Sequence, residues 1–209
     1  MKNSQLLFLV YIILTLVSCQ SKEEKAAKLI KEEMYKTLYD FSSYEPIETT
    51  IDSAFTSIYR DSTILVYAYL MNEALEKANE YMDNTKDAQS SLEIWAGSYS
   101  GYGLSQYNKA KEEFTSNLDK AQEYMIELRN LQKLTKEKAE NFESTFCGWQ
   151  AKHKFRCKTK GGSFDLPNYL YLFDTDLKKI TYHENMDDED LKNFRELIDE
   201  ALKDNSENE

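Results

Sequence analysis

The sequence WQAKHKFRCK, residues Trp149–Lys158, alternates apolar and polar side chains without a break. A period of two is typical of a β-strand, in which successive side chains point to opposite faces of a sheet. The apolar face carries Trp149, Ala151, His153, Phe155 and Cys157, and the basic face carries Gln150, Lys152, Lys154, Arg156 and Lys158. The stretch therefore predicts a half-buried strand, and a sheet where the helical pattern of the preceding chain stops.

Downstream of this strand the pattern continues as a small antiparallel sheet. Gly161-Gly162 predicts a turn, Tyr169–Phe173 a second strand, and Ile180 with Tyr182 a short third strand. A last helix begins near Asn185 or Asp187, and its inner face carries Leu191, Phe194, Ile198 and Ala201. We expect residues 146–203 to form a small α+β region closed by this helix and packed on the helical region, followed by a polar tail, 204–209.

Upstream of the strand the period is helical. A stripe from Tyr107 to Leu131 predicts a long helix over 104–142, and another stripe runs from Ile64 toward Trp95. The glycine-rich segment 97–103 between them predicts a tight turn, so the two helices form an antiparallel hairpin. Residues 23–39 predict an N-terminal helix with the stripe Ala27, Ile30, Met34 and Leu38, and Ile47–Ile51 alternates as a short strand would. Residues 19–145 are thus expected as a helical region, and the fold class as α+β.

The first residues have the pattern of an export signal. Lys2 precedes an apolar run that ends in Leu16-Val17-Ser18-Cys19. This resembles the bacterial lipoprotein signal, which implies removal of residues 1–18, lipid on Cys19, and the membrane as a partner. The alternative is an ordinary signal peptide or a membrane helix with a chance cysteine.

The residues after Cys19 bear on the location. Position 20 is glutamine rather than aspartate, which in the resemblance implies an outer-membrane lipoprotein of the cell envelope. Lys22-Glu23-Glu24 resembles a surface-export tag of lipoproteins in some gut anaerobes, or else is a charged tether. Much of the chain after Cys19 also resembles an uncharacterised lipoprotein family of gut anaerobes. The segments that carry this resemblance are Gly148-Trp149, His153–Lys158, Gly161-Gly162, Tyr171–Asp174 and Lys179-Ile180, together with Tyr39–Phe41, Tyr44–Ile47 and Asp52–Phe55. That resemblance implies no particular biochemical activity.

Composition narrows the functional classes. The whole chain has a net charge of −11, and removing Lys2 with the signal makes it about −12, which disfavours nucleic acid as a partner. Phosphate-binding glycine loops, nucleophile elbows and zinc helices are not found in the sequence, so no cofactor is expected. His153 on its apolar face reads as a core histidine, and His183 beside Glu184 as a weaker candidate for metal or acid–base chemistry. On one strand Cys147 and Cys157 would lie roughly 33 Å apart, so we expect both to be free.

Two groups of residues remain as candidate binding surfaces. The basic face, Lys152, Lys154, Arg156 and Lys158, could meet an acidic partner such as an anionic glycan or a negatively charged protein. Alternatively, acidic side chains of neighbouring elements interleave with it, or it is simply solvated. Tyr99 and Tyr102 in the glycine-rich turn could form an aromatic binding loop or a plain connector. The sequence thus favours a non-enzymatic binding or scaffold module, with an enzyme or enzyme inhibitor acting at the sheet–helix junction as the alternative.

Overall fold

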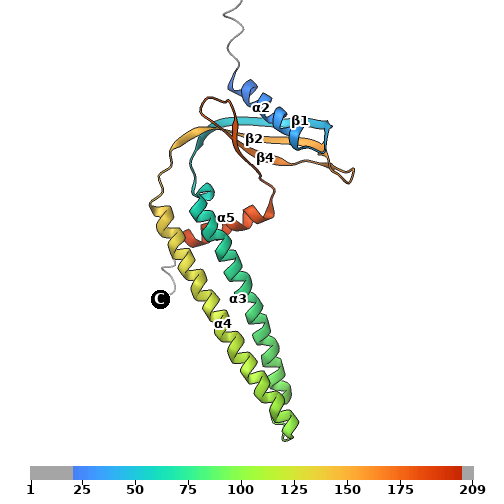
Figure 1. Cartoon of the computed structure of the whole chain (residues 1–209), viewed down its shortest axis with the longest axis vertical. Helices are drawn as coiled ribbons and strands as arrows, with labels where there is room; N and C mark the ends of the chain where they lie inside the picture. The colour runs from blue at the N-terminus through green and yellow to red at the C-terminus, as the bar shows by residue number, and fades with distance from the viewer. Residues whose placement is uncertain (1–20, 204–209) are drawn as a thin grey trace, which may run out of the picture. The chain divides into compact units, whose positions relative to one another are not determined.

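A computed structural model of the chain describes residues 21–203, and the proposed lipid site Cys19 lies outside that range. The described chain is α+β, as predicted, and divides into two compact units (Figure 1). Unit 1 consists of the chain up to Thr56 together with Ser144–Asp188, and unit 2 of Ser57–Glu143 together with the chain from Glu189. The sequence placed 19–145 in one helical region, whereas the structure assigns its first part to the unit that holds the sheet.

Unit 1 is built on an antiparallel sheet of five strands in the order β1-β2-β4-β5, with β3 paired to β2. The strands are β1 (Asp40–Phe55), β2 (Phe146–Lys158), β3 (Phe164–Asp165), β4 (Asn168–Phe173) and β5 (Ile180–Asn185). In register, Ala151 of β2 lies between Ile51 of β1 and Tyr171 of β4. The two faces predicted for β2 are confirmed, because Ala151, His153, Phe155 and Cys157 are buried while the four cations between and after them are exposed. Cys147 and Cys157 are both free, as predicted.

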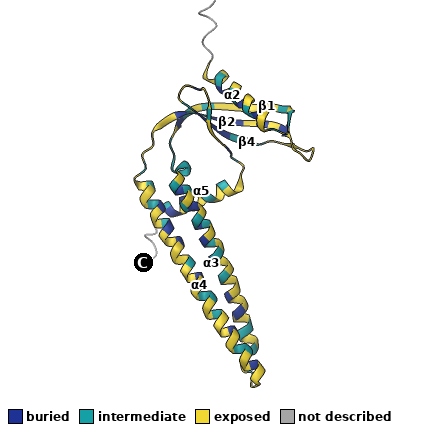
Figure 2. Ribbon diagram, in the orientation of Figure 1, coloured by how far each residue is buried: buried dark blue, intermediate teal, exposed yellow. Residues whose placement is uncertain are grey.

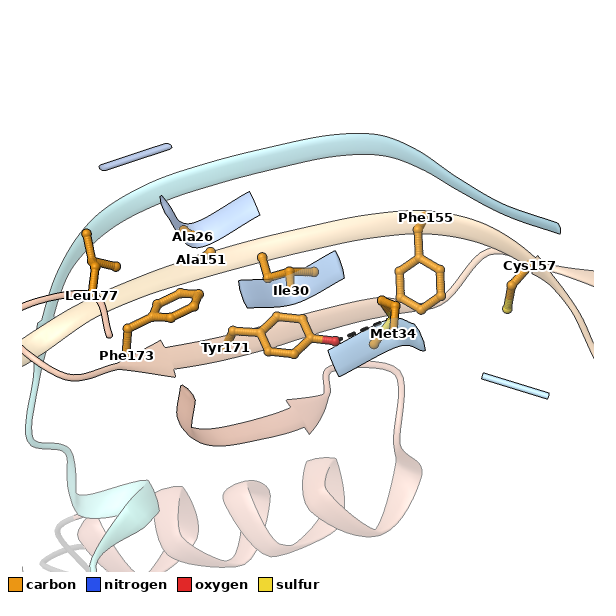
Figure 3. Packing of buried hydrophobic residues seen from close by; sticks show 9 residues of the cluster. All are labelled: Ala26, Ile30, Met34, Ala151, Phe155, Cys157, Tyr171, Phe173 and Leu177. Carbon is orange, nitrogen blue, oxygen red and sulfur yellow. Dashed lines mark hydrogen bonds between the residues drawn. The ribbon is translucent and has the colours of Figure 1, made fainter. Parts of the chain in front are cut away.

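Helix α2 (Lys22–Thr37) packs on one face of this sheet. Its N-terminus is fixed by a capping box in which Ser21 and Glu24 bond each other's backbone amides. Figure 3 shows the contact: α2 contributes Ala26, Ile30 and Met34, which lie among Ala151, Phe155, Cys157, Tyr171, Phe173 and Leu177. The predicted stripe is shifted by one residue at its start, because Ala26 is buried and Ala27 is exposed.

The first strand is much longer than the sequence indicated. Only Ile47–Ile51 was expected to be extended, yet β1 runs from Asp40 to Phe55. Its partner β2 is about a hundred residues away in the sequence, and three register shifts interrupt the pairing, between Asp40 and Glu45, between Pro46 and Glu48, and between Ala54 and Phe55. An interrupted strand shows no continuous period of two, which is why the alternation was visible only in its middle.

Unit 2 contains the predicted antiparallel hairpin, formed by α3 (Ser62–Trp95) and α4 (Gly101–Glu140) after a short 3₁₀ turn, η1 (Ile58–Arg60). Asp61 caps α3 by accepting from the amides of Thr63 and Ile64, and Ser100 caps α4 by accepting from Gly103. The connector between the two helices therefore ends before Gly101, whereas the sequence predicted a turn that continued to Gly103. In Figure 2 the buried and half-buried residues alternate with exposed ones along both helices. On α4 they recur every seventh residue in two rows: Gly103, Ala110, Asn117, Tyr124 and Leu131, and Tyr107, Phe114, Ala121, Leu128 and Thr135.

The last helix, α5 (Glu189–Leu202), belongs to unit 2, whereas the sequence grouped it with the sheet. It packs on the hairpin: Leu197, Ile198 and Ala201 join a core with Ile64, Ala68, Met71, Ala74, Leu128 and Leu131. An apolar stripe shows that one side of a helix is buried, but it does not specify the element that buries it. The helix that covers a face of the sheet is α2. Within residues 21–203, no helix is both long and apolar enough to span a membrane.

The chain leaves and re-enters unit 1 at one place. The amide of Thr56 donates to the carbonyl of Thr145 over 2.8 Å, and the amide of Thr145 donates to Oγ1 of Thr56 over 2.8 Å. Ser144 Oγ also donates to the carbonyl of Thr56 at 3.0 Å. The two ends of the segment 57–143 are thereby held side by side.

Candidate functional site

A pocket of about 440 Å³ opens in unit 1 between α2 and the first half of β1. Its walls are mainly apolar, and a histidine from the centre of the sheet lies among its lining residues. The lining consists of Ala27, Ile30 and Lys31 of α2, Phe41, Ser42, Tyr44, Pro46 and Thr49 of β1, and His153 of β2.

The pocket exists because β1 is irregular at this point. Two of the three register shifts of β1 fall beside Pro46, which has no amide hydrogen to donate to a sheet. Ser43 bridges the first shift, because its Oγ accepts the amide of Lys158 over 2.8 Å and donates to the carbonyl of Asp40 over 2.7 Å. A bulge of this kind bends a strand and redirects its side chains. Here it places the rings of Phe41 and Tyr44 parallel, with centroids 5.6 Å apart, as one wall of the pocket.

His153 is only 2% exposed, and both of its ring nitrogens are hydrogen-bonded. Nε2 lies 2.9 Å from the Tyr44 hydroxyl and Nδ1 lies 2.8 Å from Oγ1 of Thr49. The ring also stacks on Phe155 at 5.3 Å between centroids. Burial lowers the pKa of His153 to about 4, so the ring is neutral near pH 7. The interpretation of His153 as a core histidine with satisfied partners is confirmed.

Lys31 is the one charged side chain among the described residues that line the pocket. No lining residue is an aspartate or a glutamate. Burial raises the pKa of Tyr44, so its hydroxyl is also neutral near pH 7. A second, shallower hollow of about 460 Å³ adjoins the first and shares Lys31 and Phe41 with it; its other lining residues are Lys28, Glu32, Tyr35 and Lys36.

The predicted basic face does not contribute to this pocket. Lys152, Lys154, Arg156 and Lys158 are exposed on the opposite side of β2. Carboxylates of β1 stand across from two of them: Glu48 pairs in register with Lys154, and Glu45 lies 3.9 Å from Arg156. Arg156 also lies over the Phe164 ring at 3.9 Å. This is the interleaved arrangement that the sequence left open as an alternative to a binding surface.

The other predicted residues lie elsewhere. Tyr99, in the turn between α3 and α4, is fully exposed, while Tyr102 packs edge-on against Trp95 with centroids 5.6 Å apart. His183 is on β5 with its ring 5.7 Å from that of Tyr171. Its neighbour Glu184 points to the other face, as consecutive strand residues do, and accepts from the Tyr182 hydroxyl. Residues 21–203 contain no cluster of His, Cys, Asp or Glu side chains that could hold a metal ion.

Sequence reasoning missed Lys31, Tyr44 and Thr49 as site residues. They come from different elements and share no motif with His153. One usable signal was present, namely a proline within a stretch that otherwise alternates, since proline inside a strand indicates an edge or a bulge.

The chain matches no protein-family model, no curated protein and no solved structure. The geometry of the site therefore carries the functional argument.

Proposed function

We propose that this protein is a lipoprotein of the bacterial cell envelope, anchored at the outer membrane through lipid on Cys19, and that unit 1 binds a small ligand in the pocket over His153. The protein acts as a binding module rather than as an enzyme. The signal pattern that ends in Leu16-Val17-Ser18-Cys19 supports the anchor. The pocket supports the binding activity.

The observation that carries the proposal is the combination of apolar walls with a fully bonded polar floor. Ligand sites are typically concave, mostly apolar and about 300–1,000 Å³ in volume, with a few fixed polar groups. This pocket has that size and composition, with Ile30, Phe41 and Pro46 in its walls and His153 held by Tyr44 and Thr49.

The chemistry of the floor supports binding over turnover. A general base works best when its pKa is close to the operating pH, whereas the pKa of His153 is about 4. Both ring nitrogens already have partners, and the hydroxyl of Ser42 donates to Asp40 rather than to the histidine. The hydroxyl oxygens of Ser42 and Tyr44 can each still accept a hydrogen bond from a ligand without changing charge.

Blocking the pocket tests the proposal. Ala27 is exposed and lines the pocket, so Ala27→Trp fills the cavity without disturbing the core. The probe is naphthylacetamide, a neutral, flat aromatic molecule, and the readout is calorimetric titration of the unlipidated chain from Gln20 to Glu209, which includes every described element of both units. We expect the original chain to bind the probe and Ala27→Trp to lose it.

Ala96→Trp is the matched control, because Ala96 is also exposed but belongs to unit 2. It should bind the probe as the original chain does. Absence of binding to the original chain, or equal binding by Ala27→Trp, would contradict a ligand site at this position.

The anchor has a separate test. Replacing Cys19 by alanine removes the proposed acceptor of the lipid, and stable anchoring requires more than one acyl chain. We expect the variant to leave the membrane fraction, measured by fractionation of cells that produce the full chain. If Cys19→Ala is still processed and stays with the membranes after a high-salt wash, the lipoprotein proposal is wrong.

A further inference from the structure

We propose that the ligand of the pocket over His153 is an apolar acid, with an aromatic or branched hydrocarbon body in the pocket and a carboxylate at its rim paired with Lys31. This inference rests on the proposed function and adds the chemical class of the ligand. It follows from the distribution of charge around the pocket.

The charge at the rim is positive and unopposed within the pocket. Lys31 lines both hollows, and no carboxylate lines the main one. In residues 21–203 neither Lys31 nor Lys28 forms an ion pair, whereas Lys36 on the same helix lies 3.5 Å from Glu33. Lys28 precedes Lys31 by three residues, so both ammonium groups project from the same side of α2. Lys28 lines only the adjoining hollow, which Glu32 also lines, so the cation that an anion at the rim of the main pocket meets is Lys31.

The body of the ligand is set by the walls. Phe41 and Tyr44 present two nearly parallel rings with an interplanar angle of 15°, and Ile30 and Pro46 complete an apolar enclosure. A flat or branched hydrocarbon fits such walls, because it removes apolar surface from water without leaving a polar group unpaired.

The floor determines which way the ligand points. His153 is neutral, and its nitrogens are already bonded to Tyr44 and Thr49, so nothing at the floor compensates a negative charge. Burying a carboxylate there would cost free energy, whereas at the rim it stays partly hydrated and next to Lys31. The acid group therefore faces outward and the hydrocarbon faces His153.

A pair of probes of nearly equal shape isolates the charge. Naphthylacetate and naphthylacetamide differ only in the anionic group, and their affinities are compared by calorimetric titration of the unlipidated chain from Gln20 to Glu209. We expect the acid to bind about three- to ten-fold more tightly than the amide, as a partly exposed ion pair allows. The preference should decline between about 50 mM and about 500 mM salt because the ions screen the pair.

Lys31→Met removes the cation while keeping an unbranched side chain that is one atom shorter, and Lys31 is exposed, so the core is unaffected. We expect this variant to bind acid and amide equally. Lys152→Met is the matched control, since it makes the same change of net charge on the opposite face of the sheet and should keep the preference.

The outcomes separate the two proposals. Equal affinity of both probes for the original chain, or a preference that survives in Lys31→Met, overturns the assignment of an apolar acid but leaves a pocket that binds the amide. Failure of the original chain to bind either probe overturns the pocket function, and this inference with it.

Discussion

His153 couples the stability of unit 1 to pH. Its pKa is about 4 in the folded chain and its ordinary value is 6.5, so between these values the unfolded chain takes up a proton that the folded chain does not. The free energy of unfolding should therefore fall as pH is lowered from about 6.5 to about 4, by roughly 2–3 kcal/mol from this residue alone. Above about pH 6.5 His153 is neutral in both the folded and the unfolded chain, so this loss of stability is absent.

The measurement is urea unfolding at about pH 7.5 and about pH 4.5, followed by the fluorescence of Trp149 in a Trp95→Phe background. Of the two tryptophans, Trp149 is in unit 1 and Trp95 in unit 2, so the signal reports unit 1. His153→Gln can bond to the same hydroxyls but does not titrate. The stability difference between the two chains should shrink at low pH, and a difference independent of pH would contradict the buried neutral ring.

Gly148 is the glycine whose replacement should matter most in unit 1. Its φ of +141° is one that other residues rarely adopt, and a Cβ atom there would collide with the carbonyl oxygen of Phe173. We expect Gly148→Ala to lower the free energy of unfolding of unit 1 by about 2–4 kcal/mol, since it combines backbone strain with a steric clash.

Gly161→Ala is the control, because the nearest atom to a Cβ there is Oγ1 of Thr159 at 3.7 Å, an ordinary contact. Its effect on urea unfolding, followed by Trp149 fluorescence, should be close to zero. If the two alanine variants unfold at the same denaturant concentration, the close approach of β2 and β4 at Gly148 is wrong.

At the scale of elements, the hairpin depends on a seam of α4 that recurs every seventh residue and in which the small residues Gly103, Ala110 and Ala121 stand among larger ones. A strict seven-residue repeat keeps one seam of a helix facing its partner, and small side chains let the two backbones approach. Ala110 is in this seam and is 3% exposed. We expect Ala110→Leu to destabilise unit 2 by about 1–3 kcal/mol through overpacking.

Lys111→Leu adds an apolar side chain at the neighbouring, exposed position and should be nearly neutral. Both variants are compared by urea unfolding with Trp95 as the reporter in a Trp149→Phe background. Equal midpoints for the two would show that Ala110 does not lie in a helix–helix seam.

The hairpin and β2 could be predicted because the periodic pattern that indicates each of them lies within a single continuous stretch of sequence. A period of 3.6 or of 2 repeats several times within α4 and within Trp149–Lys158, and each repeat adds to the signal. The length of β1 could not be predicted, because residues 40–46 are extended only through pairing with a strand made about a hundred residues later. The helices against which α5 packs could not be predicted for a related reason: its apolar face can be read from the sequence, but the partner of that face cannot.

The pocket lies at the limit of what one sequence shows. The structural role of His153 could be predicted from its place in an apolar row. Its partners Tyr44 and Thr49 could not, since they lie 109 and 104 residues away and are aligned by a bulge in β1. A site assembled by register, rather than by a contiguous motif, has no signature in residue spacing.

For the whole molecule, the hydrogen bonds between Thr56 and Thr145 make unit 1 separable. Because the chain exits and returns side by side, the segment 57–143 can be replaced by a short glycine–serine linker, and the chain can end at Asp188. The remaining segment of about 80 residues is large enough to hold a core. We expect it to fold cooperatively, measured by thermal unfolding in circular dichroism, and to bind naphthylacetamide. A non-cooperative transition with loss of binding would show that unit 1 requires unit 2.

The departure of the chain from unit 1 at Thr56 and its return at Thr145 also affect the rate of folding. Pairing Ala54 with Gly148 closes a loop of about 90 residues, and the entropy lost in closing a flexible loop grows with its length. If α3 and α4 form first, their antiparallel path returns the chain to its start, and the effective loop shrinks to roughly ten residues, which lowers the closure cost by about 2 kcal/mol. Helical hairpins form from local contacts and so form quickly, whereas distant strand pairing is slow. The hairpin thus sets how fast the sheet assembles, and a change that loosens it delays β1 pairing even where the finished sheet is equally stable.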